Sequence, residues 1–351
     1  MLYVVINSTL FLLRISLSRQ RILRDYIFYI TIAFLFLFSA FRYEVGCDWS
    51  GYLIQYSNPF FRDWSELSIA FEPIWWAILL GVNEMNWPYP TLNIISSAVF
   101  FVGILLLARR QPDPLGFLVF LFPILIINMP MSGIRQGAAI GLICIAFIAF
   151  IDRRPLWFSF WVLLAVGFHA SAIVFFTLLP FSTARFSIKR FMFATILAIP
   201  GLILVFMMSA AQQAISRYIG TGNEAAGAIY RVGLIGLSGL YFLLFMRKKW
   251  QIAWPRDYSL AVINAFGMML VFVVLLFSSV IADRFAYYLV PIQAMFFARL
   301  PFLPFRSNWA LHVILPYIGL LLIFVVWTQT SWHFEKCYMP YKSWIFGFPD
   351  G

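Results

Sequence analysis

Charged residues are scarce in this chain. They make up 11% of its 351 residues, whereas 63% are hydrophobic and 20% are aromatic. A soluble domain needs more polar surface than this composition supplies, and no polar stretch is long enough to form a second domain. The composition therefore excludes a soluble protein. It predicts a single integral membrane domain over residues 1–351.

Cysteine and histidine are also few, with three of each. Paired ligands at zinc spacing, glycine-rich phosphate loops and the nucleophilic-serine motif are all missing. His312 and His333 lie far along the chain from His169, which argues against a metal site built from histidines. We therefore expect a metal-independent protein without a cofactor. Cys47 and Cys337 leave one alternative open, a disulfide in an oxidising compartment.

The net charge of +11 does not indicate a nucleic-acid partner, because of where the positive charge lies. Most Lys and Arg fall in short clusters between apolar segments, at 14–24, 109–110, 153–154, 185–190, 247–256 and 299–306. Clusters of this kind are typical of the cytoplasmic loops of membrane proteins. They place these loops on the inner side of the bilayer.

Apolar segments recur along the whole chain. They lie at about 3–17, 26–41, 69–83, 89–108, 115–129, 133–151, 156–180, 190–209, 232–246, 259–281, 284–302 and 308–328. A helix needs roughly 20 residues to cross the hydrocarbon core, and several of these segments are shorter. The pattern predicts an all-α polytopic membrane protein with about 11–12 transmembrane or half-membrane helices.

The positions of the basic clusters predict the topology of the second half. There 210–231 becomes an outward loop and 329–351 an outward tail; in the first half, 42–68 becomes an outward loop if the cluster at 14–24 lies inside. Segment 156–180 has basic residues at both ends, so it must begin and end on the inner side. We expect two half-length helices that meet near residues 167–169, because broken helices are tolerated where they line a protein interior.

In the first half, the alternation of inner and outer loops cannot satisfy the same charge rule. Counting helices from the basic cluster at 14–24 leaves Arg109 and Arg110 on the outer side, against the expected charge distribution. One short segment must therefore enter and leave the membrane on the same side. The segments 69–83 and 115–129 are both short enough, and the sequence does not choose between them.

Candidate functional residues lie at the outer ends of these helices. The stretch RYEVGCDWSGY, from Arg42 to Tyr52, combines both signs of charge with aromatic rings directly after an apolar segment. Glu72, Arg135 and His169 lie inside or at the ends of apolar segments, where ionisable groups are costly and indicate function. The candidates for a catalytic base are His169, Asp48 and Glu72. His169 comes first because neutral imidazole accepts protons near neutral pH.

The other candidates suit a phosphorylated sugar substrate. Arginine binds phosphate through two parallel hydrogen bonds, and Trp and Tyr offer flat faces to sugars. The predicted substrate-binding residues are Arg42, Trp49, Tyr52, Arg135, Gln136, Arg217, Arg231, Arg284 and Tyr288. Each has a structural alternative: an arginine can anchor a helix end, and His169 can pack between helices. Their predicted convergence on one face of the membrane is what favours function.

The same positions resemble the EpsG-like branch of the Wzy polysaccharide polymerases. The matching elements, in chain order, are Arg42, Gly46, Asp48 and Tyr52; Glu72-Pro73; Ile134-Arg135-Gln136; Phe168, His169, Ser171 and Ala172; Arg284, Tyr287 and Tyr288; and Pro340-Tyr341. Their order and spacing run over nearly the whole chain, although each is short. Cys47 departs from the pattern, because the family more often has Thr there.

The resemblance implies a multi-pass glycosyltransferase of the GT-C type in the bacterial inner membrane. Its substrates would be oligosaccharide repeat units linked to undecaprenyl pyrophosphate, which it would polymerise into O-antigen, capsule or exopolysaccharide. Because the lipid pyrophosphate is the leaving group, neither a nucleotide sugar nor ATP is needed. The implied partners are these lipid-linked units, the bilayer and a chain-length regulator protein.

Two other functions remain open at this point. An O-antigen ligase would transfer finished glycan to a lipid, but such enzymes usually carry a larger outward loop than 210–231. A flippase or other transporter of lipid-linked glycans tends to show repeated halves and ionisable residues throughout the bilayer depth. This chain shows neither feature, which favours the polymerase.

Overall fold

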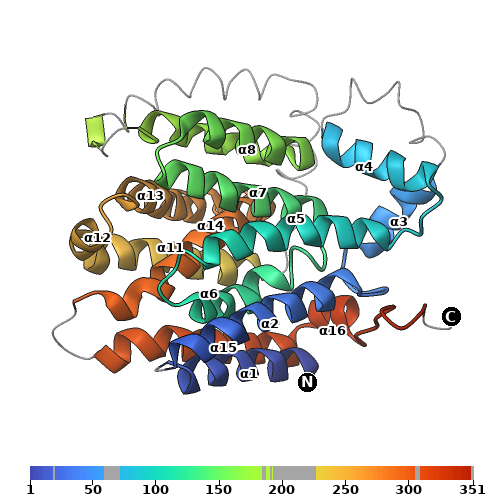
Figure 1. Ribbon diagram of the computed structural model, residues 1–351, viewed down its shortest axis with the longest axis horizontal. Helices are drawn as coiled ribbons and strands as arrows, with labels where there is room; N and C mark the ends of the chain where they lie inside the picture. Colours follow the sequence, from blue (N-terminus) through green and yellow to red (C-terminus); the bar gives the residue numbers. More distant parts are fainter. Residues whose placement is uncertain are drawn as a thin grey trace. The chain divides into compact units, whose positions relative to one another are not determined.

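The computed structural model describes residues 1–18, 20–58, 72–183, 187–189, 192, 227–304 and 309–348. Within these residues every regular element is a helix, and only two isolated β-bridges occur (Figure 1). The predicted all-α polytopic class is confirmed. Arg217 and most of the segments 190–209 and 210–231 lie outside the described residues.

Most helices fall on the predicted apolar segments, whereas the short helices α3, α12 and α16 lie between or after them. The helices are α1 (Leu2–Ser16), α2 (Arg21–Ala40), α3 (Trp49–Ser57), α4 (Pro73–Glu84), α5 (Thr91–Ala108), α6 (Pro114–Leu121), η3 (Phe122–Ile126), α7 (Ile134–Ile151), α8 (Pro155–Phe168), η4 (Ala170–Phe181), α11 (Ala228–Tyr241), η5 (Phe242–Met246), α12 (Arg247–Ala253), α13 (Tyr258–Val274), α14 (Ser279–Arg299), η6 (Leu300–Phe302), α15 (Trp309–Thr330) and α16 (Trp332–Tyr338).

Several helices are long and apolar enough to cross a bilayer. In the described part of the chain these are α2, α5, α7 and the continuous stretch Ala228–Ala253. A fifth is obtained if Ile314–Thr330 and Trp332–Tyr338, which meet at 79°, count as one broken span. Further apolar helices are 10–17 residues long, as the short segments in the sequence required. The protein is therefore a multi-pass helical membrane protein.

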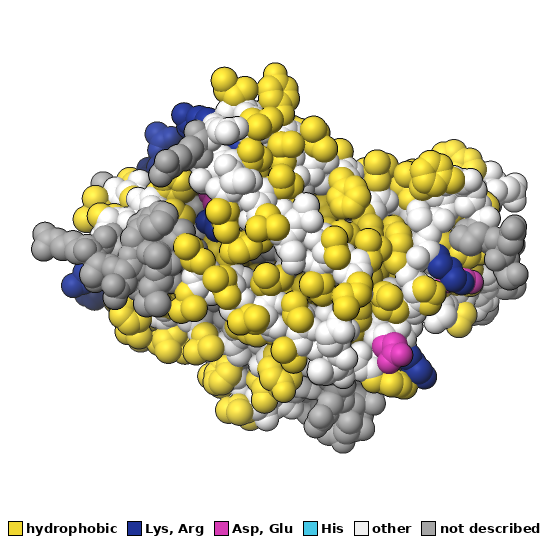
Figure 2. Space-filling model, turned by 90° about the horizontal axis from the view of Figure 1, so that it is seen from below, with side chains coloured by type: hydrophobic (Ala, Val, Ile, Leu, Met, Phe, Trp, Pro, Cys, Tyr) yellow, Lys and Arg dark blue, Asp and Glu magenta, His cyan; other side chains and the backbone are white. Residues whose placement is uncertain are grey.

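The outer surface of these helices is apolar. Hydrophobic side chains cover most of the face in Figure 2, and the few charged side chains lie towards its margins. In the first unit, Leu12 of α1, Ile22 of α2 and Val326 of α15 are 63%, 77% and 60% exposed. A soluble protein rarely exposes contiguous apolar patches of this extent, whereas lipid tails solvate them. This surface faces lipid.

The helices form two compact units, each described by itself. The first contains Met1–Ile145, Trp161–Ile173 and Phe297–Gly351, and the second contains Ala146–Phe160 and Val174–Phe296. In the first unit, α1 packs against α6 and α15, and α2 packs against α5. In the second, α11 packs against α13. The prediction of one membrane domain over the whole chain stays a prediction.

Charged side chains inside the first unit are paired. The Nε of Arg14 donates to Asp113 Oδ2 at 2.7 Å, while Asp113 Oδ1 accepts from the backbone N–H of Gly116 at the start of α6. In the same unit, Arg299 Nε donates to Gln111 Oε1 at 2.8 Å. A buried charge without such partners would cost several kcal/mol. These pairs join segments that are far apart in sequence.

The expected break in segment 156–180 is confirmed. Helix α8 ends at Phe168 and η4 begins at Ala170, so His169 lies at the junction between them. The expected boundary of the loop 210–231 is wrong at its end, because α11 begins at Ala228. Gly227 has a φ of 73°, which ends the loop in a conformation that glycine adopts without strain, and Arg231 lies in the first turn of the helix.

Two glycines bring α5 and α7 into backbone contact. A Cβ added to Gly103 would lie 1.9 Å from the carbonyl oxygen of Gly141, and a Cβ on Gly141 would lie 2.6 Å from the backbone of Phe100. Small residues allow such close approach, which is how membrane helices gain packing energy without a hydrophobic driving force.

We expect Gly103→Ala to destabilise the protein by about 1–3 kcal/mol, because the methyl group overlaps backbone atoms that cannot rotate away. The thermal unfolding midpoint in detergent measures this. Gly81→Ala in α4 is the matched control, since nothing lies within 4 Å of its added Cβ. Equal midpoints for the two variants would contradict the close helix contact.

Candidate active site

Glu72 lies at the centre of a polar cluster in the first unit. It directly precedes Pro73, the first residue of α4, and its side chain is 10% exposed. One carboxylate oxygen, Oε2, accepts a hydrogen bond from Arg135 Nη1 at 2.6 Å. The other, Oε1, lies 2.6 Å from His169 Nδ1 and accepts from the backbone N–H of Ala170 at 3.2 Å. One carboxylate thus joins three separate segments.

The broken helix explains why His169 and Glu72 meet. The backbone N–H of Ala170, at the start of η4, has no partner in the preceding turn and donates to Glu72 instead. The negative charge also lies at a helix N-terminus, where the helix dipole favours it. With Nδ1 donating to Glu72, the neutral ring of His169 presents Nε2 as a proton acceptor. The break therefore brings an imidazole and a carboxylate into direct contact.

Arg135 begins α7 and lies between Glu72 and two aromatic rings. Its guanidinium carbon is 5.5 Å from the ring centre of Tyr52 and 5.9 Å from that of Trp75. The side chain is 27% exposed, and its buried Nε has no hydrogen-bond partner among the described residues. Arg135 is therefore a part-exposed cation that is paired with one carboxylate.

The pKa of Glu72 follows from these contacts. Glu72 lies outside α4. Burial raises its pKa, but the hydrogen bond from His169 and the charge of Arg135 outweigh burial and hold the pKa below its ordinary value. Glu72 is therefore ionised at neutral pH. An ionised carboxylate beside His169 stabilises the imidazolium that forms when the ring accepts a proton.

Arg42 is buried to 1% exposure in the loop after α2. Its guanidinium donates to the carbonyl oxygens of Ser39 and Val45 and to Asn93 Oδ1, each at 2.9 Å. Burial lowers its pKa, and tyrosine hydroxyls nearby counteract this. These contacts give Arg42 the role of holding the loop against α5. Its direct contact with substrate stays a prediction.

Asp48 is exposed at the end of the same loop. Its backbone N–H donates to Ser132 Oγ at 3.3 Å, and Ser132 Oγ donates to Asp48 Oδ2 at 3.3 Å. Ser132 precedes Arg135 by three residues, so the loop and the start of α7 are joined. The loop also makes a close approach at Gly46, whose φ is 108°. An added Cβ there would overlap the carbonyl oxygen of Met131.

The predicted aromatic residues of this region are largely packed. Tyr52 is 6% exposed and makes an edge contact with Trp75, with ring centres 5.4 Å apart. Trp49 contacts Tyr43 and Tyr89 edge-on, and the Tyr89 hydroxyl donates to the Trp49 carbonyl. Gln136, next to Arg135, is buried. Sugar binding by Trp49 and Tyr52 stays a prediction.

The predicted residues of the second unit form their own contacts. Arg231 makes a bidentate ion pair with Asp283, with both N–H···O distances at 2.8 Å, and its guanidinium lies 5.5 Å from the Tyr287 ring centre. Asp283 thus pairs with Arg231. Arg284 is exposed on α14, and Tyr288 is fully buried, in contact with Phe175. Their convergence with the first unit's cluster stays a prediction.

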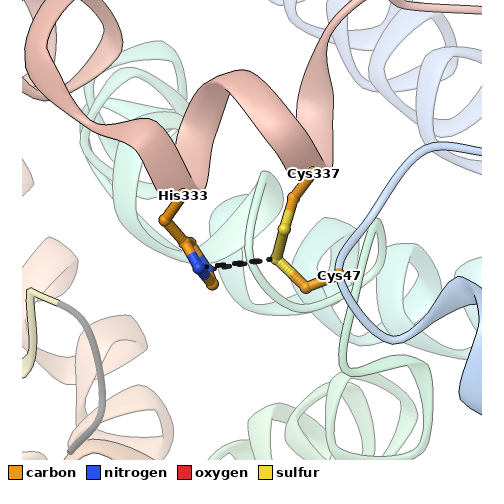
Figure 3. A group of neighbouring side chains, drawn as sticks. All are labelled: Cys47, His333 and Cys337. Carbon is orange, nitrogen blue, oxygen red and sulfur yellow. Dashed lines mark hydrogen bonds between the residues drawn. A yellow bond between two sulfur atoms is a disulfide. The ribbon is translucent and has the colours of Figure 1, made fainter.

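The first unit also contains a cluster of Cys47, His333 and Cys337. Cys47 and Cys337 form a disulfide, which was one alternative open from the sequence, and His333 Nε2 lies 3.1 Å from Cys47 Sγ (Figure 3). The bond ties the loop that carries Asp48 to α16. Sequence reasoning separated His333 from the other histidines and missed this cluster. The signal was present in the four-residue spacing of His333 and Cys337, which puts both on one face of a helix.

Several residues beside the cluster were also missed from the sequence. Asn93, Trp75 and Ser132 contact Arg42, Arg135 and Asp48 respectively. Neutral side chains inside apolar segments, or between two of them as Ser132 is, give no charge signal, so only the folded structure reveals them.

Comparison with known proteins identifies the family. The EpsG family model matches residues 25–343, which include every segment of the Glu72 cluster. The chain belongs to the EpsG family. The stated resemblance is thereby confirmed. Family membership together with the apolar helices indicates a membrane role related to exopolysaccharide.

One characterised relative supports this role. The "EPS I polysaccharide export inner membrane protein EpsF" of Ralstonia solanacearum is 31% identical over 107 residues, which cover 29% of this EpsG-family chain. The match spans 25% of that protein's length. No solved structure matches the chain. The GT-C type of fold therefore stays a prediction.

We expect Glu72→Gln to lower the thermal unfolding midpoint at pH 7, because the neutral amide has only one oxygen and cannot accept hydrogen bonds from both Arg135 and His169. The free energy of unfolding should fall by about 1–3 kcal/mol. The folded pKa of Glu72 lies below 4.5, so its stabilisation is fully present above pH 4.5 and is lost as the pH falls through the lowered folded value. The difference between wild type and variant should therefore shrink only in acid.

The control is Glu44→Gln, which removes a carboxylate whose partner Lys342 is about as exposed as itself. Such a surface pair contributes about 0–1 kcal/mol, so its midpoint should stay near that of the wild type. A Glu72→Gln deficit that is the same at pH 7 and at pH 3 would contradict the ionised carboxylate.

Proposed function

We propose that this protein is a glycosyltransferase of the bacterial inner membrane that polymerises oligosaccharide repeat units linked to undecaprenyl pyrophosphate. The observation that carries the proposal is the Glu72–His169–Arg135 cluster at the break between α8 and η4. It combines an oriented base with a part-exposed cation. EpsG family membership supports a polysaccharide substrate.

The reaction needs a base and a cation at neighbouring positions. The hydroxyl oxygen of the incoming unit attacks the anomeric carbon of the growing chain, and its proton passes to His169 Nε2. The bond from that carbon to the pyrophosphate oxygen breaks, and undecaprenyl pyrophosphate leaves with the bonding electrons. Glu72 holds the ring and stabilises its protonated form, as a carboxylate does in a catalytic triad.

Arg135 supports departure of the leaving group. Negative charge on the pyrophosphate grows in the transition state, and a fixed guanidinium lowers the barrier by stabilising that charge. The two aromatic rings beside it exclude water and so strengthen the interaction. In this proposal Asp48 and Trp49 contact the sugar of the incoming unit.

We expect His169→Ala to slow polymerisation by about 10²–10⁴-fold, the usual contribution of a general base. The assay uses purified protein in detergent with lipid-linked repeat units extracted from a strain that accumulates them. Product length on gels gives the rate. Because detergent removes any barrier to transport, polymer formed there supports an enzyme. Intact transport in vesicles with no polymer in detergent would favour a transporter and overturn the proposal.

We expect Arg135→Ala to lower the rate by about 10²–10³-fold, which is the usual cost of losing one transition-state donor. Arg109→Ala is the matched control, because this arginine is exposed at the end of α5 and far in sequence from the cluster. It should polymerise at the wild-type rate. An Arg135→Ala variant that also does so would remove pyrophosphate stabilisation from the mechanism.

A further inference from the structure

The disulfide between Cys47 and Cys337 has an imidazole directly beside it. The ligand atoms of Cys47, His333 and Cys337 all lie within 4.8 Å of one another, and all three residues are half-buried (Figure 3). In Figure 3 the ring of His333 points at the sulfur of Cys47. Two sulfurs and one nitrogen at this separation match the donor set of a thiolate–imidazole metal site.

The distances suit a tetrahedral ion once the disulfide is reduced. Zinc binds thiolate sulfur at about 2.3 Å and imidazole nitrogen at about 2.0–2.1 Å, which places neighbouring ligand atoms about 3.5–3.8 Å apart. The His333 Nε2 to Cys47 Sγ distance of 3.1 Å needs only a small shift. Once the disulfide is broken, the sulfurs of Cys47 and Cys337 need only separate to about 3.5–3.8 Å. The two thiolates also neutralise the charge of a divalent ion.

The backbone around the cluster keeps the ligands together without the disulfide. The N–H of Gly46 donates to the carbonyl of Cys337, and Tyr43 N–H donates to the carbonyl of Lys342 at 2.9 Å. The N–H of Trp344 donates to the carbonyl of Phe41 at 3.0 Å. Reduction removes none of these bonds, so both segments stay side by side. A preorganised ligand set binds metal without first ordering the chain.

The helix fixes the other two ligands. His333 and Cys337 are four residues apart on α16, so they share one face. That helix is anchored by Phe334 and Tyr338, which are 3% and 1% exposed, and the Tyr338 carbonyl accepts from the Tyr3 hydroxyl at 3.1 Å. The ligands therefore come from two rigidly held segments and leave a fourth coordination position open.

We propose that Cys47, His333 and Cys337 form a redox-gated site that binds a thiophilic divalent ion such as Zn²⁺ when the disulfide is reduced. An external dithiol supplies two electrons and becomes a disulfide itself, while Cys47 and Cys337 become thiols. Binding of the ion then releases two protons, one from each thiol, and the neutral imidazole donates its lone pair. An external disulfide reoxidises the site: it accepts two electrons and becomes two thiols, the Cys47–Cys337 bond forms again, and the ion is expelled. The site is separate from the proposed polymerase chemistry.

The test uses Co²⁺ as a spectroscopic probe of the full-length protein in detergent, purified without a histidine tag. One sample is reduced with a phosphine, and the reductant is removed under argon. We expect the reduced protein to bind one Co²⁺ per chain, with thiolate-to-cobalt charge-transfer absorption that Zn²⁺ abolishes. The unreduced protein should show no such absorption. Absence of the band from the reduced protein would overturn the proposal.

Variants separate this site from other thiols. His333→Ala retains the disulfide, so its fold is preserved. After reduction its Co²⁺ affinity should fall at least about 10-fold, because mutating even the residues that hydrogen-bond a metal ligand costs that much. Cys144→Ser removes the one cysteine outside the disulfide, which is buried in α7, and should bind as wild type does. Unchanged Co²⁺ binding in His333→Ala, or its loss in Cys144→Ser, would contradict the assignment.

Discussion

The Glu72 carboxylate is the interaction on which the rest of the site depends. A charge with so little exposure is tolerated only because each of its oxygens accepts a hydrogen bond and a cation lies beside it. The same bonds join the start of α4, the start of α7 and the gap between α8 and η4. The broken helix is therefore part of the site. The backbone N–H of Ala170, which the break leaves free, donates to the Glu72 carboxylate, and the same carboxylate orients His169.

The arginines of this protein divide by what surrounds them. Arg42 and Arg231 have their donors committed to protein acceptors, the first to carbonyls and an amide, the second to a carboxylate in bidentate geometry. Arg135 donates to Glu72 through Nη1 and packs on aromatic rings, and within the described part of the chain its buried Nε has no hydrogen-bond partner. Position in the sequence does not reveal this difference. The hydrogen-bond partners of each guanidinium reveal it, because a buried donor without a partner is costly.

Helix positions were readable from the sequence because a bilayer demands long apolar runs, and the break near His169 followed from basic residues at both ends of segment 156–180. The pairing of Glu72 with His169 was not readable. The two are 97 residues apart, and the sequence offered them as competing bases rather than as partners. The predicted loop boundary at 231 was wrong because an arginine there suggested a loop, whereas its backbone N–H donates to the Gly227 carbonyl in the first turn of α11.

The covalent link between Cys47 and Cys337 spans 290 residues of sequence. Translation proceeds from the N-terminus, so the loop bearing Asp48 emerges long before its partner cysteine exists. That loop is closed only after α15 and α16 have been made and have reached the same side of the membrane. Assembly of this protein thus has a built-in final step, and a chain stalled during insertion cannot carry a finished loop.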